Sequence, residues 1–236
     1  MKKFGIILWM AVFAFAGTVQ AQDLDKVLKN HFEAIGQDKV LKTKGIKMEG
    51  SINQMGMEIP FKAMQVRPDK MRTEGTFQGM TFIQVYNGEK GWTINPFTGS
   101  SEPQPMGPDE LKSMKQQSDM DGMLWNWKDK GYKVELVGKE DVEGTPCYNL
   151  QVITDENDIF NYYIDADSYM VLKVASAVVV QGNVSESETY MSNYMQVGGM
   201  AFPGTIETKS NGQTVMTMSF SNVEVDPAMD AALFEM

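Results

Sequence analysis

The sequence predicts a mainly β protein of the α+β class, in which one long antiparallel sheet is accompanied by an N-terminal helix and a helical insertion near mid-chain. Three observations predict this fold. Apolar residues recur at helical spacing over residues 24–35, strand-like alternation begins near residue 45, and turn dipeptides follow at short intervals as far as the C-terminus.

The first 21 residues have the pattern of a secretory signal peptide. Two lysines precede an apolar stretch, residues 4–17, and small residues lead up to Ala21. The apolar stretch is short for a membrane span, and polar sequence follows it. Gln22 stands where a lipid-modified cysteine would follow the cleavage point. We therefore predict cleavage after Ala21 and a freely soluble periplasmic protein, residues 22–236, that forms a single domain.

The composition excludes some classes of partner. The chain has 31 acidic and 21 basic side chains, a formal net charge of −10, and loss of the signal peptide removes two of the lysines. Phosphate binding is driven by clustered Lys and Arg, so we expect no nucleic-acid partner. The single cysteine, Cys147, cannot form an intramolecular disulfide. We expect a monomer whose stability comes from its hydrophobic core.

The first element after Ala21 is an amphipathic helix over residues 23–36. Its apolar residues recur at helical spacing: Leu24, Val27, Leu28, Phe32 and Ile35. Asp23 can cap its start and Gly36 its end. The apolar stripe of such a helix has to be buried against another element.

From Gly45 onward the pattern changes to the alternation of half-buried strands. The alternating apolar residues of the first two strands are Ile46, Met48, Ile52, Met57, Ile59 and Phe61. Turn signals then recur, among them Asn87-Gly88 and Asn211-Gly212, and such pairs favour the hairpin turns of antiparallel sheets. The breaks predict about ten or eleven strands, enough for a large curled sheet or a barrel.

One stretch, residues 103–130, interrupts the strands. Within it, residues 109–117 and 123–130 have the pattern of short helices. Residues 170–180, by contrast, are apolar on both faces of a predicted strand apart from Lys173 and Ser176, which requires cover on both sides of the sheet. The leading helix and the insertion can supply that cover.

Three runs of residues carry a family resemblance. They are VRPDKMR at 66–72, YNGEKGW at 86–92 and NPF at 95–97, and the chain closes with DAALF at 230–234. In this order and spacing they resemble the LolA-type family of periplasmic carriers that sort outer-membrane lipoproteins. The resemblance implies a curled, unclosed antiparallel β-barrel whose apolar concave face is covered by helices, with the acyl chains of a lipoprotein in the space between.

The resemblance also implies which residues contact the acyl chains. The expected lining residues are Met48, Ile52, Ile59, Phe61, Phe82, Trp92, Ile94 and Trp125. The 20 methionines of the chain fit such a role, because flexible thioether side chains can repack around acyl chains of varied shape. The alternative is that these residues fill gaps in an ordinary core.

Arg67 is the charged residue that the resemblance singles out. In the family, the arginine before this proline resembles a latch that donates hydrogen bonds to the lid backbone and keeps the empty cavity closed. Its five donors in a fixed geometry suit that role. The alternative is a surface turn residue ahead of Pro68.

The sequence gives little indication of a catalytic or metal-binding site. His31, the single histidine, lies beside the stripe of the leading helix and is expected to be a helix-surface residue, and Cys147 has no local partner to activate it. The Met-X-Met runs at 55–57 and 216–218 could suit copper(I), but no Cys or His lies near either in the sequence. We predict no enzymatic activity, no metal and no cofactor.

The predicted function is therefore that of a carrier that holds the acyl chains of lipoproteins, or lipids, and moves them towards the outer membrane. The resemblance implies an inner-membrane donor and an outer-membrane acceptor as its partners. A module of the same fold that senses lipid or mislocalised lipoprotein is the alternative. Such regulators usually carry a second domain, for which this chain is short.

Overall fold

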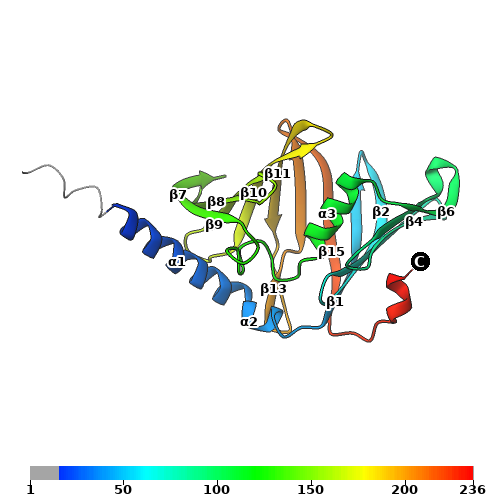
Figure 1. Ribbon diagram of the computed structural model, residues 1–236, viewed down its shortest axis with the longest axis horizontal. Coiled ribbons are helices and arrows are strands. Elements are labelled where there is room, and N and C mark those ends of the chain that lie inside the picture. The colour runs from blue at the N-terminus through cyan, green and yellow to red at the C-terminus, as the bar shows by residue number, and fades with distance from the viewer. Residues whose placement is uncertain (1–15, 236) are drawn as a thin grey trace, which may run out of the picture.

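The computed structural model describes residues 16–235. Most of the predicted signal peptide therefore lies outside the described residues. The helices are α1 (Ala16–Ile35), α2 (Gln37–Val40) and α3 (Pro108–Ser118), with 3-10 turns η1 (Pro96–Thr98) and η2 (Ala231–Phe234). The fold is mainly β, as predicted, and its arrangement is shown in Figure 1.

The described residues form fifteen strands, more than the ten or eleven expected. The first six are β1 (Gly45–Gln54), β2 (Met57–Val66), β3 (Lys70–Phe77), β4 (Met80–Tyr86), β5 (Gly91–Asn95) and β6 (Ser100–Pro105). After α3 come β7 (Lys133–Val142), β8 (Thr145–Ile153), β9 (Ile159–Asp165), β10 (Val171–Val180) and β11 (Asn183–Ser192). The last four are β12 (Met195–Val197), β13 (Met200–Phe202), β14 (Thr205–Ser210) and β15 (Gln213–Val225).

Thirteen of these strands make one antiparallel sheet that does not close. Its order is β6-β5-β4-β3-β2-β1-β15-β14-β11-β10-β9-β8-β7, and β12 and β13 form a separate ribbon. The first and last strands of the chain thus pair in the middle, whereas the two edge strands follow each other in sequence. The connection between them, residues 106–132, therefore has to pass from one edge of the sheet to the other. We call residues 106–132 the lid.

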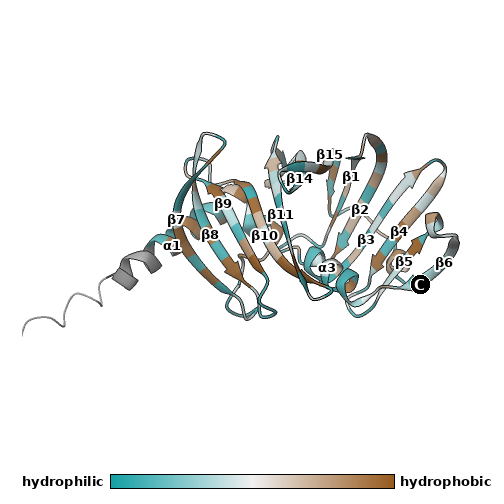
Figure 2. Ribbon diagram, turned by 90° about the horizontal axis from the view of Figure 1, so that it is seen from above, coloured by the Kyte–Doolittle hydropathy of each residue, from teal (hydrophilic) through white to brown (hydrophobic). Residues whose placement is uncertain are grey.

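The register defines an inner face of this sheet. Paired residues share a face, and alternate residues along a strand point to opposite faces. Met71 pairs with both Gln65 and Tyr86, and further along the sheet Val174 pairs with Tyr162. We call the face that carries these side chains the inner face and the opposite one the outer face. Figure 2 shows the sheet bending around the side on which α3 lies.

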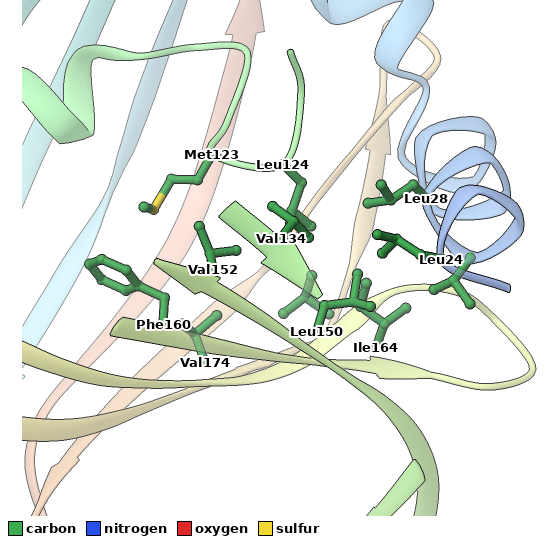
Figure 3. Packing of buried hydrophobic residues seen from close by; sticks show 12 residues of the cluster. Leu24, Leu28, Met123, Leu124, Val134, Leu150, Val152, Phe160, Ile164 and Val174 are labelled. Atoms are coloured by element: carbon green, nitrogen blue, oxygen red, sulfur yellow. The ribbon is translucent and has the colours of Figure 1, made fainter. Parts of the chain in front are cut away.

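Helices cover the inner face at two places. α1 packs on the part formed by β7–β10, together with lid residues Met123 and Leu124 (Figure 3). The buried residues of this main core are Leu24, Val27, Leu28, Met123, Leu124, Val134, Leu150, Val152, Phe160, Ile164, Val171 and Val174. At the other place, Met114 of α3 packs with Met71 and Tyr86 over β3 and β4.

Two details of the predicted helices differ. α1 begins at Ala16 and runs through Asp23, so Asp23 is not its cap, although Gly36 follows the helix with the left-handed φ of 73°. Residues 123–130 form a series of turns and not a helix. Asn126 has a φ of 48°, outside the right-handed helical region, and this interrupts the helical hydrogen bonds. The other predicted helix is α3. No helix among residues 16–235 is long and apolar enough to span a membrane.

Candidate functional site

The middle of the inner face is the candidate site. Between the areas under α1 and α3, apolar side chains of six strands stay partly exposed: Met48, Ile52, Ile59, Phe82, Met191, Ile206, Met216, Met218 and Phe220. The rings of Phe61 and Phe220 meet edge to face across β1, 5.5 Å apart at 78°. A row of apolar side chains left partly uncovered inside a curved sheet is a surface suited to an apolar ligand.

Five of the predicted lining residues lie on this face. Met48 pairs with Ala63, Ile52 pairs with Ile59, and Phe61 faces Gly75, which pairs with Phe82. Phe61 is buried and the other four are partly exposed. The alternating pattern of β1 and β2 places four of them on one face, and Phe82 joins them from β4.

Trp92 and Ile94 lie on the outer face. Trp92 pairs with Val85 and Ile94 with Ile83, and Trp92 packs in an outer cluster around Phe234 of η2. The motif that contains Trp92 does not indicate which face of the sheet each of its residues occupies. A shift of one residue in the strand register moves a side chain to the other face. These two residues therefore have no place in the site that we propose.

Trp125 belongs to the lid, as predicted, but points towards α1. Its ring packs edge to face on Phe32, with ring centroids 5.0 Å apart at 75°. Trp127 packs against the same main core. The indole of Trp125 thus helps to fasten the lid to the N-terminal helix.

Arg67 is a partly buried residue that joins the lid to the start of the sheet. Its Nε donates to the carbonyl of Thr43 at 2.8 Å, and Nη2 donates to the carbonyl of Val40 at 2.8 Å. Nη2 also donates to Oδ1 of the lid residue Asp121 at 2.5 Å. The acceptor in the lid is thus a carboxylate and not the backbone expected from the resemblance. The bonded backbone carbonyls belong to the last residue of α2 and to the segment between α2 and β1.

Two glutamines, which the sequence did not single out, hold the lid backbone. Gln65 on the inner face donates from Nε2 to the carbonyl of Gln117 at 2.6 Å. The buried Gln37 donates to the carbonyl of Asp121 at 3.0 Å. The sequence could have indicated that Gln65 lies on the inner face, since it is in phase with Phe61 and Ala63 on a predicted strand. Gln37 carries no comparable signal.

Lys112 of α3 fastens the lid to the turn between β8 and β9. Its Nζ lies 2.6 Å from Oδ2 of Asp158 and 2.8 Å from Oε2 of Glu156. These hydrogen bonds, that of Asp158 first, raise the pKa of Lys112. Asp158 is buried and also accepts from the backbone N–H of Val179. The lid is therefore held by ionic contacts at Lys112 and, nearer its middle, at Asp121.

Pockets among the described residues include two outside the apolar face. One, of about 390 Å³, lies beside the lid and is lined largely by charged residues of the lid and of the turns at 68–69 and 154–158. The other, of about 330 Å³, lies on the outer face of β10 and β11. None of the predicted lining residues borders either pocket. The apolar candidate site is an open face and is separate from both.

His31 is buried, against the surface position expected for it. Its Nδ1 lies 2.9 Å from the carbonyl of Tyr169, so this nitrogen carries the proton and donates it. Burial lowers the pKa of His31, and the hydrogen bond to Tyr169 opposes that effect. The imidazole ties α1 to the turn between β9 and β10.

Comparisons with known proteins bear on the fold. No protein-family model and no curated protein matches the sequence. Among solved structures, a LolA superfamily protein from Nitrosomonas europaea superposes with a TM-score of 0.60 at 11% identity, over 89% of this chain and 96% of the other. The chain has a LolA-like fold. The resemblance first given by three short motifs thus extends to the arrangement of the whole sheet.

Two further structures share this LolA-like fold. A DUF1329 family protein from Desulfovibrio piger has a TM-score of 0.63 at 17% identity, covering 89% of this chain and 97% of the other. A structure described as an outer-membrane lipoprotein-sorting protein domain, from Vibrio parahaemolyticus, has a TM-score of 0.57 at 13% identity, with the same coverage. At these identities the likeness concerns the fold.

Proposed function

We propose that this protein is a periplasmic carrier that binds the acyl chains of lipoproteins, or lipids, on its inner face and moves them towards the outer membrane. The observation that carries the proposal is the row of partly exposed apolar side chains in the middle of that face. It lies between two covered areas, in a fold shared with a lipoprotein-sorting domain. A binding role needs no catalytic group.

The energetics favour such binding. Each acyl methylene transferred from water to an apolar surface gains about 0.8 kcal/mol. The inner face offers several methionines, among them Met48 and Met218, whose unbranched side chains adapt to varied chains. The lid is held by few polar contacts, so a long acyl chain supplies enough free energy to displace it.

Fatty-acid binding in solution tests the proposal. The delipidated protein should bind a long-chain fatty acid saturably, and Met48→Asp and Phe82→Asp should each weaken binding about tenfold or more, because a carboxylate on this face opposes desolvation. Val137→Asp, at an exposed position in β7, is the control and should bind as the parent does. No saturable binding by the folded parent would contradict the proposal.

The tryptophans give a second readout. Emission from Trp125 in the lid should shift when fatty acid binds, whereas Trp92 on the outer face should respond little. Single replacement of each by Phe separates the two signals. Native mass spectrometry of the protein purified from periplasm would identify the cargo, and co-purifying lipoproteins would favour a carrier over a sensor.

A further inference from the structure

The exposed apolar side chains of the protein gather in its hairpins. Nine large apolar residues are strongly exposed in the described part of the chain. Eight of them lie in or next to the turns that end β1, β3, β5, β10 and β14: Met55, Met57, Met80, Phe97, Val179, Val180, Val184 and Val215. Val137 in the edge strand β7 is the exception. Scattered exposure would not produce this distribution.

These hairpins project from one end of the sheet. Strand order runs β4-β3-β2-β1-β15-β14-β11-β10, and all neighbours are antiparallel, so the turns at 55–56, 78–79, 181–182 and 211–212 lie on the same side. Figure 1 shows the β1–β2, β10–β11 and β14–β15 turns together at the top of the molecule. We call these four turns and their flanking residues the hairpin end.

The four hairpins of this end carry no charge, whereas the next turn on the same side, residues 154–158 beside β10, contains Asp155, Glu156 and Asp158. Residues 50–57, 75–88, 174–185 and 210–223 contain no Asp, Glu, Lys or Arg, in a chain with a formal net charge of −10. Charged side chains are what normally keep exposed hairpins and strand ends from sticking to other molecules. Because these four neighbouring hairpins have none, their surface consists of exposed apolar side chains at the tips and uncharged polar side chains around them.

Met55 shows that the exposure is not imposed by the turn. It has a φ of 52° and is 89% exposed, at the first position of a tight turn before Gly56. Asn, Asp or Gly suit this conformation better. The turns of two neighbouring hairpins, Gln181-Gly182 and Asn211-Gly212, place polar residues there. A large apolar side chain at this position gains nothing from the fold.

We propose that the hairpin end docks on a bilayer of neutral, zwitterionic phospholipid. Exposed Met and Val side chains at the tips can enter the interfacial layer, and the four tips themselves carry no charged group that has to be desolvated with them. An anionic bilayer is disfavoured by the acidic remainder of the chain.

Docking in this way would place the inner face next to the bilayer. Ile52, Met216 and Met218 lie on the inner face of the same hairpins whose tips carry Met55 and Val215. An acyl chain could pass between bilayer and inner face along uncharged residues. The docking itself does not depend on acyl-chain binding and is tested separately from it.

Flotation with phosphatidylcholine vesicles tests the docking. The full exported chain should float with the vesicles, with little dependence on salt, and phosphatidylglycerol in the vesicles should weaken binding. Met55→Asp and Val184→Asp should each reduce binding about tenfold, since each puts a charge at the contact. Val137→Asp should bind as the parent does. Equal thermal midpoints would show that all three variants are folded.

A tryptophan reporter locates the contact. Val184→Trp should show blue-shifted emission that brominated phosphatidylcholine quenches, whereas Val137→Trp should show neither effect. Absence of flotation by the folded parent, or equal loss in the Val137→Asp control, would overturn the proposal. So would concentration-dependent dimers that Met55→Asp abolishes, because the end would then be a contact between two copies. Fatty-acid binding in solution should survive the hairpin substitutions, and its absence from the folded parent would count against the carrier and not against docking.

Discussion

His31 is a single side chain that makes the stability of the folded protein depend on pH. The imidazole is buried between α1 and the β9–β10 turn and donates to the Tyr169 carbonyl, and burial holds its pKa below the ordinary value of 6.5. The folded protein therefore resists protonation at a pH where the unfolded chain accepts a proton. Because the chain has one histidine, this linkage can be observed without interference from others.

We expect stability to fall as the pH drops below about 6.5, by up to roughly 1.4 kcal/mol per pH unit until the folded pKa is reached. Above the unfolded pKa the histidine is neutral in both states, and its contribution is complete. His31→Asn should flatten this dependence while keeping a donor for Tyr169. Urea unfolding between pH 7.5 and 5.5 checks it. An equal slope in the parent and the variant would mean that other groups cause the dependence.

Residue positions were predictable where strand alternation fixed them. Met48, Ile52, Ile59 and Phe61 follow one period and share a face. The prediction that Trp92 and Ile94 lie on the inner face was wrong. Their strand is short, and the pairing of Tyr86 with Gly91 decides which of its residues point to which face. The prediction that His31 lies on the helix surface was wrong because its burial depends on Tyr169, 138 residues away in the sequence.

The lid is the element that covers the inner face on both sides of the candidate site. Arg67 and Asp121, Lys112 and Asp158, and the two glutamines bind it at separate points. None of these pairs is adjacent in sequence, so no local pattern specifies them. α3 was predictable from its periodicity, whereas the second helix failed because of the left-handed Asn126.

Arg67→Leu should loosen the lid and leave the sheet folded. It removes a charged hydrogen bond to Asp121, which contributes roughly 1.5 to 3 kcal/mol, and the bonds to Val40 and Thr43. The open form should then be favoured, bound lipid retained more tightly and its release slowed, because closure no longer competes. Hydrogen exchange at amides 119–124 should become faster.

Asp121→Asn is the matched variant for this prediction. It weakens the lid contact of Arg67 and leaves the two carbonyl bonds of the guanidinium in place. It should reproduce the faster exchange and the slower lipid release with a smaller loss of stability. Parental exchange and release in both variants would reduce Arg67 to a turn residue.

The whole molecule is a strip of thirteen strands whose edges are tied by its own lid. The curled, unclosed sheet was predictable from turn spacing and family resemblance, but the strand order was not. Pairing of β1 with β15 is specified by residues at opposite ends of the chain, with a bulge between Glu49 and Gly50. Such long-range pairing leaves no trace in local periodicity.

Cutting the lid should therefore leave the protein in one piece. A protease site inserted after the exposed Gly107 would divide the chain into a part with α1 and β1–β6 and a part with β7–β15. The two parts stay joined by the β1–β15 ladder and by α1 on β7–β10. Gel filtration should show one species until denaturant is added. Separation in native buffer would mean that the lid holds the two halves together.

The central ladder also limits when the sheet can be completed. Lys47 on β1 bonds to Glu224 on β15 across 177 residues of sequence. Almost the entire chain therefore has to be present where it folds before the middle of the sheet can form, and contacts of such separation form slowly. Until then β1 is an unpaired edge that can recruit the wrong strand. The last strand made completes the sheet, and a chain that stalls before β15 remains as two half-sheets with open edges.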